Sequence, residues 1–203
     1  MNDYQEKSRR AFDGQAADYD TDHFGDHARK LYGVLLSQVM QIPHAAVLDL
    51  GCGTGELLAR FLEQAPKARC AGLDLSEGML SVAREKLGDR AELVRGDAER
   101  LPFGDGVFDV VLCSDSFHHY PDPRAVLAEV SRVLSPGGVF LLGDCTAPGA
   151  VRGLMNLLLP LSREGDVRLY GRKELRGLLD AAGFHGGECR KIDATSLLAW
   201  GIR

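Results

Sequence analysis

Short apolar runs alternate along the chain with segments in which apolar residues recur at helical spacing. Residues 45–50 are apolar except for Asp49 and are followed at once by Gly51, which is typical of a strand buried on both faces. Residues 56–64 carry their apolar side chains on one helical face and end before Pro66, so they predict a helix. The same patterns predict further strands at 70–75, 91–95, 108–113, 139–142, 188–192 and 197–202, and further helices at 76–87, 123–134 and 175–182.

This alternation of strands and helices predicts an α/β fold, a doubly wound and mostly parallel sheet built from right-handed βαβ units. The chain is expected to form one domain, residues 1–203, with a core at 45–145 and a C-terminal helix and antiparallel hairpin at 173–203. Residues 1–40 and 148–172 lie outside the alternation. We expect both segments to act as lids over the carboxyl ends of the strands, where open α/β sheets bind ligands.

The composition indicates a globular protein without an overall positive charge. Hydrophobic residues make up 45% of the 203 residues and charged residues 26%, and the net charge is −5. This balance argues against a dedicated binder of nucleic acid or of an anionic membrane, because neutralising phosphates requires a basic face, and it leaves a local basic patch open. Five cysteines without a CxxC spacing favour reduced thiols and a cytoplasmic location. The N-terminus lacks the apolar region of a secretory signal.

The strongest local motif is a glycine-rich turn after the first strand. Gly51, Gly53 and Gly55 alternate there, and small residues of this kind let the backbone approach a ligand closely. A dinucleotide site requires GxGxxG, but Glu56 occupies the last position, and Asp49 adds a second carboxylate. Two like charges about 4 Å apart repel by roughly 4 kcal/mol at an effective dielectric near 20, so the acids disfavour a pyrophosphate and favour a cation. No Lys-Ser/Thr pair follows, which excludes a Walker loop.

Acidic residues also end the next two strands. Asp74 is placed to accept hydrogen bonds from both hydroxyls of a ribose, and Asp97 from an adenine amino group. The apolar Leu75, Met79 and Ala98 are placed to enclose the adenine ring. A cationic group near the glycines, a ribose at Asp74 and an adenine at Asp97 together describe S-adenosylmethionine.

With these motifs the chain resembles the class I S-adenosylmethionine-dependent methyltransferases, in particular the group that includes ubiquinone and menaquinone methyltransferases. The resemblance covers about residues 12–145 and rests on the segments 12–20, 49–55, 73–76, 96–103, 108–109 and 134–138. It implies a Rossmann-like, seven-stranded sheet whose last strand is antiparallel. It also implies that Tyr19 folds over the methionine part of the cofactor, and that Thr54 and Ser114 belong to the cofactor site.

The segment after the fourth strand contains the adjacent residues His118 and His119, where the reacting methyl group is expected. One histidine could act as a general base towards a phenol, enol or hydroxyl group, and the alternative is that both shape the pocket. Adjacent side chains rarely converge on one ion and no third ligand is evident, so no metal site is predicted. Asp109 is interpreted as a structural acid at the start of its strand.

The predicted function is methyl transfer to a small-molecule acceptor by direct in-line displacement. Apolar lid residues favour an acceptor with an apolar part, namely Phe24, Tyr32, Leu154, Leu157, Leu158 and Tyr170. Two alternatives stay open: a non-catalytic module that binds the same cofactor, and a nicotinamide-dependent oxidoreductase, which Glu56 disfavours. The pattern indicates neither a particular acceptor nor an oligomeric state.

Overall fold

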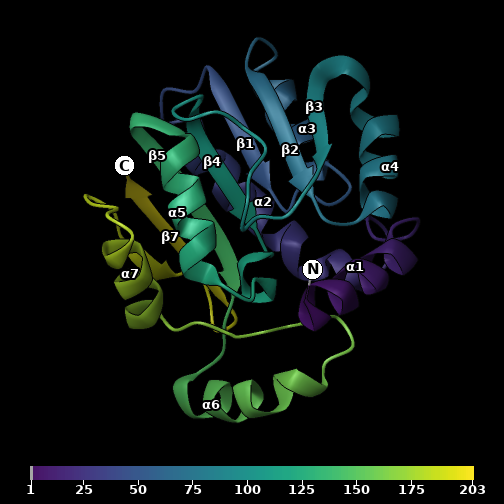
Figure 1. The fold of residues 1–203 in the computed structure, drawn as a ribbon, viewed down its shortest axis with the longest axis vertical. Coiled ribbons are helices and arrows are strands. Elements are labelled where there is room, and N and C mark those ends of the chain that lie inside the picture. Colours follow the sequence, from purple (N-terminus) through teal and green to yellow (C-terminus); the bar gives the residue numbers. More distant parts are fainter. Residues whose placement is uncertain (1) are drawn as a thin grey trace.

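A seven-stranded sheet forms the centre of the molecule in the computed structural model, which describes residues 2–203 (Figure 1). The strands run in the order β3-β2-β1-β4-β5-β7-β6, and only β7 is antiparallel to its neighbours. Their bounds are β1 Ala46–Leu50, β2 Arg69–Asp74, β3 Ala91–Arg95, β4 Phe108–Ser114, β5 Leu134–Cys145, β6 Cys189–Lys191 and β7 Ser196–Ile202. The predicted doubly wound sheet with an antiparallel last strand is confirmed.

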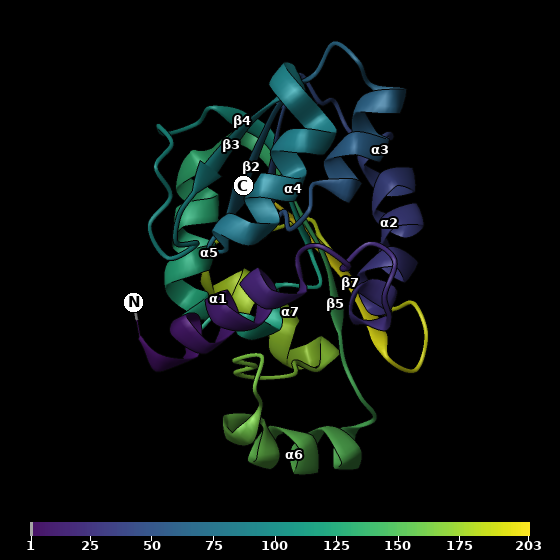
Figure 2. The same cartoon turned by 90° about the vertical axis from the view of Figure 1, so that its right-hand side faces the viewer.

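Helices cover both faces of the sheet (Figure 2). One face carries α2 (Asp26–Val39), α3 (Glu56–Gln64) and α4 (Glu77–Leu87), and the other carries α5 (Pro123–Val133) and α7 (Arg172–Ala181). Alternate residues of β1 belong to the two hydrophobic clusters, Val47 to the first face and Leu48 and Leu50 to the second. Every residue of β1 is buried, as its almost unbroken apolar run predicts.

The fifth strand is longer than the sequence predicts. We expected Pro136, Gly137 and Gly138 to separate a helix from a strand at 139–142, but β5 begins at Leu134 and runs to Cys145. Leu134 pairs with Phe108 before the register shifts, and Gly137 has a φ of +80°, so the strand passes through an irregularity at these residues. At its other end β5 continues because residues 143–145 pair with β7.

The two helices of the N-terminal segment, residues 2–40, pack in different places. α1 (Asp3–Gln15) lies across the carboxyl ends of the parallel strands (Figure 1). α2 instead packs Leu31, Leu35 and Val39 against the sheet, with none of these side chains exposed. Within residues 2–40, only α1 and the loop that connects it to α2 lie where a lid was expected, and the lid function stays a prediction.

The inserted segment 148–172 carries α6 (Gly149–Leu158), which lies beyond the carboxyl edge of the sheet (Figures 1 and 2). Its polar side chains face the protein: Arg152 donates to the carbonyl of Ala147, and Asn156 exchanges two hydrogen bonds with the backbone of Leu169. Its apolar side chains, Leu154, Leu157 and Leu158 among them, are exposed. Within residues 2–203 no helix is both long and apolar enough to cross a membrane.

Candidate functional site

A cavity opens at the carboxyl ends of β1, β2 and β4, where α1 crosses the sheet. The space between its walls, counted together with open solvent at its mouth, is roughly 900 Å³. Twelve of the predicted site residues line it: Tyr19, Asp49, Gly51, Gly53, Thr54, Asp74, Leu75, Met79, Asp97, Ala98, Ser114 and His119. Gly55 and His118 do not.

The glycine turn is held tightly between β1 and the segment after β4. Gly51 has a φ of +72°, and its backbone N–H donates to the carbonyl of Leu73 over 2.8 Å. A Cβ at this position would lie 2.1 Å from Oγ of Ser116, which leaves no room for any side chain. Gly55 packs against α4, where a Cβ would lie 2.7 Å from Leu87, so it shapes the turn and does not face the cavity.

We expect Gly51→Ala to lower the free energy of unfolding by about 1–3 kcal/mol more than Gly53→Ala does. Both glycines have positive φ, so both variants share the backbone strain, but a Cβ on Gly53 would meet nothing within 4 Å. Urea unfolding of the two variants measures the difference. Equal losses of stability would show that Ser116 yields to the new methyl group.

Asp74 is fixed by two backbone donors at the end of β2. Its Oδ2 accepts from the N–H of Gly53 and its Oδ1 from the N–H of Ser76, each over 2.8 Å. Ser76 in turn caps α4, because its hydroxyl accepts from the N–H of Met79 over 3.1 Å. The carboxylate therefore joins the glycine turn to the start of α4 and is held rigidly at the cavity wall.

Three cavity residues carry buried polar atoms without a partner in the described part of the chain: Oδ1 of Asp49, Oγ of Ser114 and Nδ1 of His119. Asp49 is only 1% exposed. Burial and the nearby negative charge of Asp74 raise the pKa of Asp49 to about 7. A buried acid without a partner is costly, so this wall of the cavity favours a ligand that brings a cation or a donor.

Comparison with known proteins decides the family. A profile described as a methyltransferase domain matches residues 48–142. The chain is also 34% identical over 192 residues to malonyl-(acyl-carrier protein) O-methyltransferase from Geobacter sulfurreducens, a match that covers 90% of this chain and 71% of that protein. This chain belongs to the class I S-adenosylmethionine-dependent methyltransferases.

Two further likenesses agree with this methyltransferase family. Demethylmenaquinone methyltransferase from Deinococcus radiodurans is 39% identical over 107 residues, but the chain spans only 44% of that protein's length. The crystal structure of 1,6-didemethyltoxoflavin-N1-methyltransferase from Burkholderia thailandensis, bound to its substrate and S-adenosylhomocysteine, superposes with a TM-score of 0.75 at 24% identity, covering 98% of this chain and 88% of that one. At that identity the likeness shows the fold.

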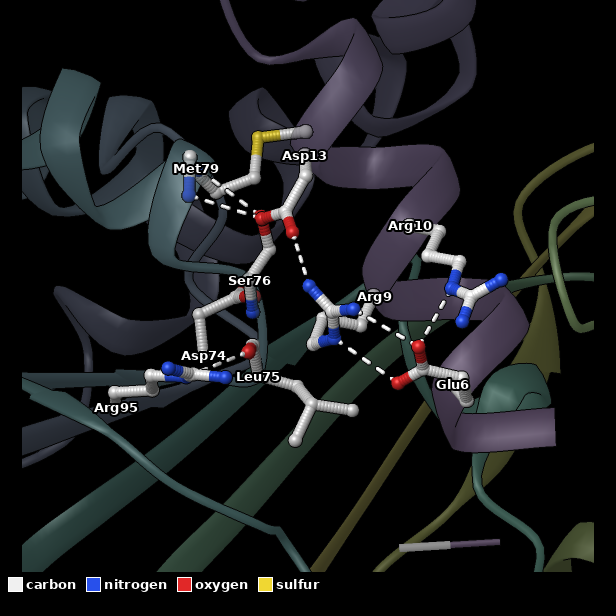
Figure 3. Close-up of polar contacts among 10 residues, drawn as sticks. Glu6, Arg9, Arg10, Asp13, Asp74, Leu75, Ser76, Met79 and Arg95 are labelled. Carbon is white, nitrogen blue, oxygen red and sulfur yellow. Dashed lines mark hydrogen bonds and ion pairs between the residues drawn. The ribbon is translucent and has the colours of Figure 1, made fainter. Parts of the chain in front are cut away.

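α1 crosses the cavity of the methyltransferase and is tied to the start of α4 (Figure 3). Asp13 accepts hydrogen bonds from the hydroxyl of Ser76 over 2.6 Å and from the N–H of Gly78 over 3.0 Å. Arg9 pairs with Asp13 over 2.6 Å and also binds Glu6 on the previous turn. The last turn of α1 is thus held to the start of α4, next to Asp74.

A second tie lies over the predicted adenine site. Nε2 of Gln5 donates to Oδ2 of Asp97 over 2.8 Å, and the N–H of Glu99 donates to the other oxygen of Asp97 over 2.9 Å. Gln5 is itself buried and lines the cavity. It is a site residue that the sequence reasoning missed, because no local motif links residue 5 to a strand end ninety residues later.

Glu56 does not act as the sequence argument assumes. Lys86 on α4 contacts Glu56 over 2.7 Å and Asp20 over 2.6 Å, and Arg60 contacts Glu56 over 2.8 Å. The hydroxyl of Thr54 donates to Asp20 over 2.6 Å, which draws the N-terminal loop onto the glycine turn. Glu56 is paired with two cations and does not line the cavity, whereas Asp49 and Asp74 do.

The adjacent histidines differ in their surroundings. Nδ1 of His118 is hydrogen-bonded to Asp144 over 2.6 Å behind the cavity wall. Burial alone would lower the pKa of His118, but the neighbouring Cys145 and Asp144 raise it well above the ordinary value. Burial and the positive charge of His118 lower the pKa of His119 to about 3. His119 is therefore neutral, and Phe12 packs edge-on against its ring with centroids 5.2 Å apart.

Sequence reasoning also missed the pair His27 and Asp115, which joins α2 to the segment after β4. Nδ1 of His27 lies 2.7 Å from Oδ1 of Asp115, and its Nε2 lies 3.0 Å from Oγ of Ser196. Asp115 lines the cavity and, among the described residues other than glycine, it alone has a positive φ, +51°. Burial would raise the pKa of Asp115, but the bond to His27 holds it below the ordinary value. The left-handed backbone at Asp115 is one that aspartate adopts more readily than most residues.

Proposed function

We propose that this methyltransferase acts on a small molecule with an apolar or aromatic part, and that its cofactor lies along the three acids of the cavity. When bound, S-adenosylmethionine supplies a methyl group activated by a sulfonium cation. The observation that carries the proposal is the buried Oδ1 of Asp49, which has no partner among the described residues. A cationic ligand compensates such a charge, whereas a diphosphate would add repulsion from Asp49 and Asp74.

The other predicted residues would hold the remaining parts of the cofactor. Asp74 would receive the ribose hydroxyls, since each of its oxygens keeps a lone pair beyond the backbone bond it already accepts. Met79 and Ala98 would enclose the adenine, and Asp97 would accept from its amino group beside Gln5. Tyr19, which lines the cavity next to Phe12, would cover the methionine part.

Several aromatic rings support an acceptor with an apolar part. Phe12, Tyr19, Tyr32 and Tyr120 all line the cavity. Leu154, Leu157 and Leu158, which we expected to contribute to it, are instead exposed on α6. These aromatic side chains would align the acceptor. Direct methyl transfer requires the acceptor atom about 3–3.5 Å from the methyl carbon and in line with the C–S bond that breaks.

The roles of the histidines as general bases stay predictions. His118 is a poor base, because its Nδ1 is committed to Asp144. Nδ1 of His119 has no hydrogen-bond partner within residues 2–203. The cytoplasmic location predicted from the cysteines likewise stays a prediction.

An acceptor screen tests the proposed function. The purified protein is incubated with S-adenosylmethionine and small phenols, quinols, carboxylic acids and heteroaromatic amines, and formation of S-adenosylhomocysteine is measured by mass spectrometry. Turnover of acceptors with an aromatic or apolar part is expected. Turnover of acyl-carrier-protein-bound substrates alone would contradict a free small-molecule acceptor, and cofactor binding with no turnover of any acceptor would favour a non-catalytic binding module.

Cofactor affinity should also depend on pH through Asp49. Because burial raises the pKa of Asp49 to about 7, the carboxyl is neutral below that pH and charged above it. A cationic ligand binds the charged form, so we expect the Kd for S-adenosylmethionine to rise about tenfold for each unit of pH below 7. Calorimetric titrations between pH 5.5 and 8 measure this slope. Asp49→Asn is the matched control and should give a flatter profile, and equal slopes would refute the assignment.

A further inference from the structure

Three side chains outside the assigned cofactor contacts converge at the carboxyl ends of β4 and β5. Nε2 of His118 lies 3.5 Å from Oδ1 of Asp166, and Nδ1 of His119 lies 3.4 Å from the same oxygen. The ligand atoms of all three residues lie within 4.8 Å of one another. The rings of the two histidines are brought side by side by the short 3₁₀ helix Phe117–His119, with their centroids 4.0 Å apart.

These distances are wrong for hydrogen bonds and right for ligands of one ion. An N–H···O bond spans about 2.7–3.2 Å, which is shorter than either contact to Asp166. Two ligands each about 2.1 Å from a tetrahedral cation are about 3.4 Å apart. Independently, Nδ1 of His119 is buried without a hydrogen-bond partner in the part of the chain that the structure describes, on a side chain that is only 9% exposed. A buried lone pair aimed into this cluster calls for a donor or a cation.

Each of the other two ligands is oriented by a second partner. Nδ1 of His118 is engaged by Asp144 over 2.6 Å, which turns Nε2 towards the cluster. Oδ2 of Asp166 accepts from the hydroxyl of Ser162 over 2.5 Å, which leaves Oδ1 for the cluster. The backbone N–H of Val167 donates to the carbonyl of His118 over 2.9 Å and fixes the loop beside the histidines. Outer contacts of this kind are typical of protein metal sites.

We propose that His118, His119 and Asp166 bind one divalent transition-metal cation of the Zn²⁺ or Fe²⁺ type. Two imidazoles and one carboxylate suit these ions and leave coordination positions open for a further ligand. His119 also lines the cavity, so the ion would lie beside the acceptor region. Both imidazole nitrogens would bind the ion in their deprotonated form, and the ion would occupy the lone pair of His119 that a general base would use.

The proposal departs from the sequence argument against a metal. That argument held that adjacent histidines rarely converge on one ion and that no third ligand is evident. The third ligand comes from the inserted segment 148–172, far along the chain, and the 3₁₀ turn aligns the two rings. Neither feature is visible in the local pattern around His118 and His119.

A cobalt titration tests the site without reference to methyl transfer. Tag-free protein is stripped with EDTA, dialysed and titrated with CoCl₂ while the visible spectrum is recorded, and ZnCl₂ binding is measured by calorimetry. We expect one equivalent of Co²⁺ with the intense d–d bands of a tetrahedral or five-coordinate site. Asp166→Asn should weaken binding of both ions at least tenfold, while the exposed control Asp89→Asn should bind as the native protein does.

The outcomes decide the proposal. Absence of saturable binding in the native protein, or equal Co²⁺ binding by native protein and Asp166→Asn, would overturn it. Asp166 lies in a loop, so its variant is expected to fold, which near-ultraviolet circular dichroism checks. If it does not, His119→Gln replaces it in the same titration with the exposed His185→Gln as its control, and equal binding by those two variants would overturn the site as well. Because no acceptor is needed, a failed acceptor screen and a failed metal titration are separate results.

Discussion

Asp74→Ala is expected to weaken the binding of S-adenosylhomocysteine by about a hundredfold. Hydrogen bonds to a charged acceptor each contribute about 1.5–3 kcal/mol, so the loss of two ribose contacts removes about 3 kcal/mol. The carboxylate is also the acceptor for the N–H groups of Gly53 and Ser76, so its removal loosens the glycine turn as well. Isothermal titration calorimetry measures the change.

Two controls separate ribose recognition from general damage. Asp74→Asn keeps the size and one acceptor oxygen, so its loss of affinity should fall between those of native protein and Asp74→Ala. Asp89→Asn removes an exposed carboxylate far from the cavity lining and should leave affinity unchanged. An unaltered Kd in Asp74→Ala would refute the assignment of the ribose to this residue.

Asp144→Ala is expected to lower the free energy of unfolding by about 3–5 kcal/mol, the usual cost of breaking a buried ion pair. Asp144 is only 3% exposed, and its Oδ1 binds both Nδ1 of His118 and the N–H of Cys145. Removing the carboxyl leaves a buried imidazole without its partner. For a chain of this length the loss corresponds to a Tm lower by roughly 6 to 20 °C. Thermal and urea unfolding of EDTA-treated protein measure it.

A double variant shows whether the pair or the packing is responsible. His118→Phe with Asp144→Leu replaces both polar groups by apolar ones, which often restores stability or improves it. We expect this variant to recover at least half of what Asp144→Ala loses. A double variant as unstable as the single one would assign the cost to packing, and a single variant within 1 kcal/mol of the native protein would contradict the prediction outright.

The parts of the fold that sequence could predict are those governed by local patterns. The apolar run before Gly51 and the helical spacing after Gly55 define β1 and α3 almost to the residue. β5 differs because its ends are determined by pairing: Leu134 joins β4 across an irregular Pro-Gly-Gly segment, and Cys145 joins β7. A proline and two glycines indicate a break locally, but an irregular strand tolerates them when its neighbours supply the pairing.

In the site, too, the sequence could predict the residues that belong to a local pattern and not those brought in by the tertiary fold. The acids at 49, 74 and 97 could be found because each lies at or just beyond the end of a recognisable strand, and the carboxyl ends of parallel strands meet at one edge. Gln5, His27 and Asp166 could not, since each reaches the site from an element outside the βαβ alternation. The charge of Glu56 was also misjudged from the sequence. Its ion-pair partner Lys86 lies on the following helix, α4, so the local pattern around Glu56 does not reveal the pairing.

The structure of crystals soaked with S-adenosylhomocysteine tests the central claim most directly, namely that acids at the strand ends select a nucleoside without phosphates. We predict density along the cavity with the ribose hydroxyls on Asp74, the adenine between Met79 and Ala98, and the amino-acid part next to Asp49. A parallel soak with NADH should leave this cavity free of diphosphate. Diphosphate density over Gly53, or S-adenosylhomocysteine bound away from Asp74, would contradict the account.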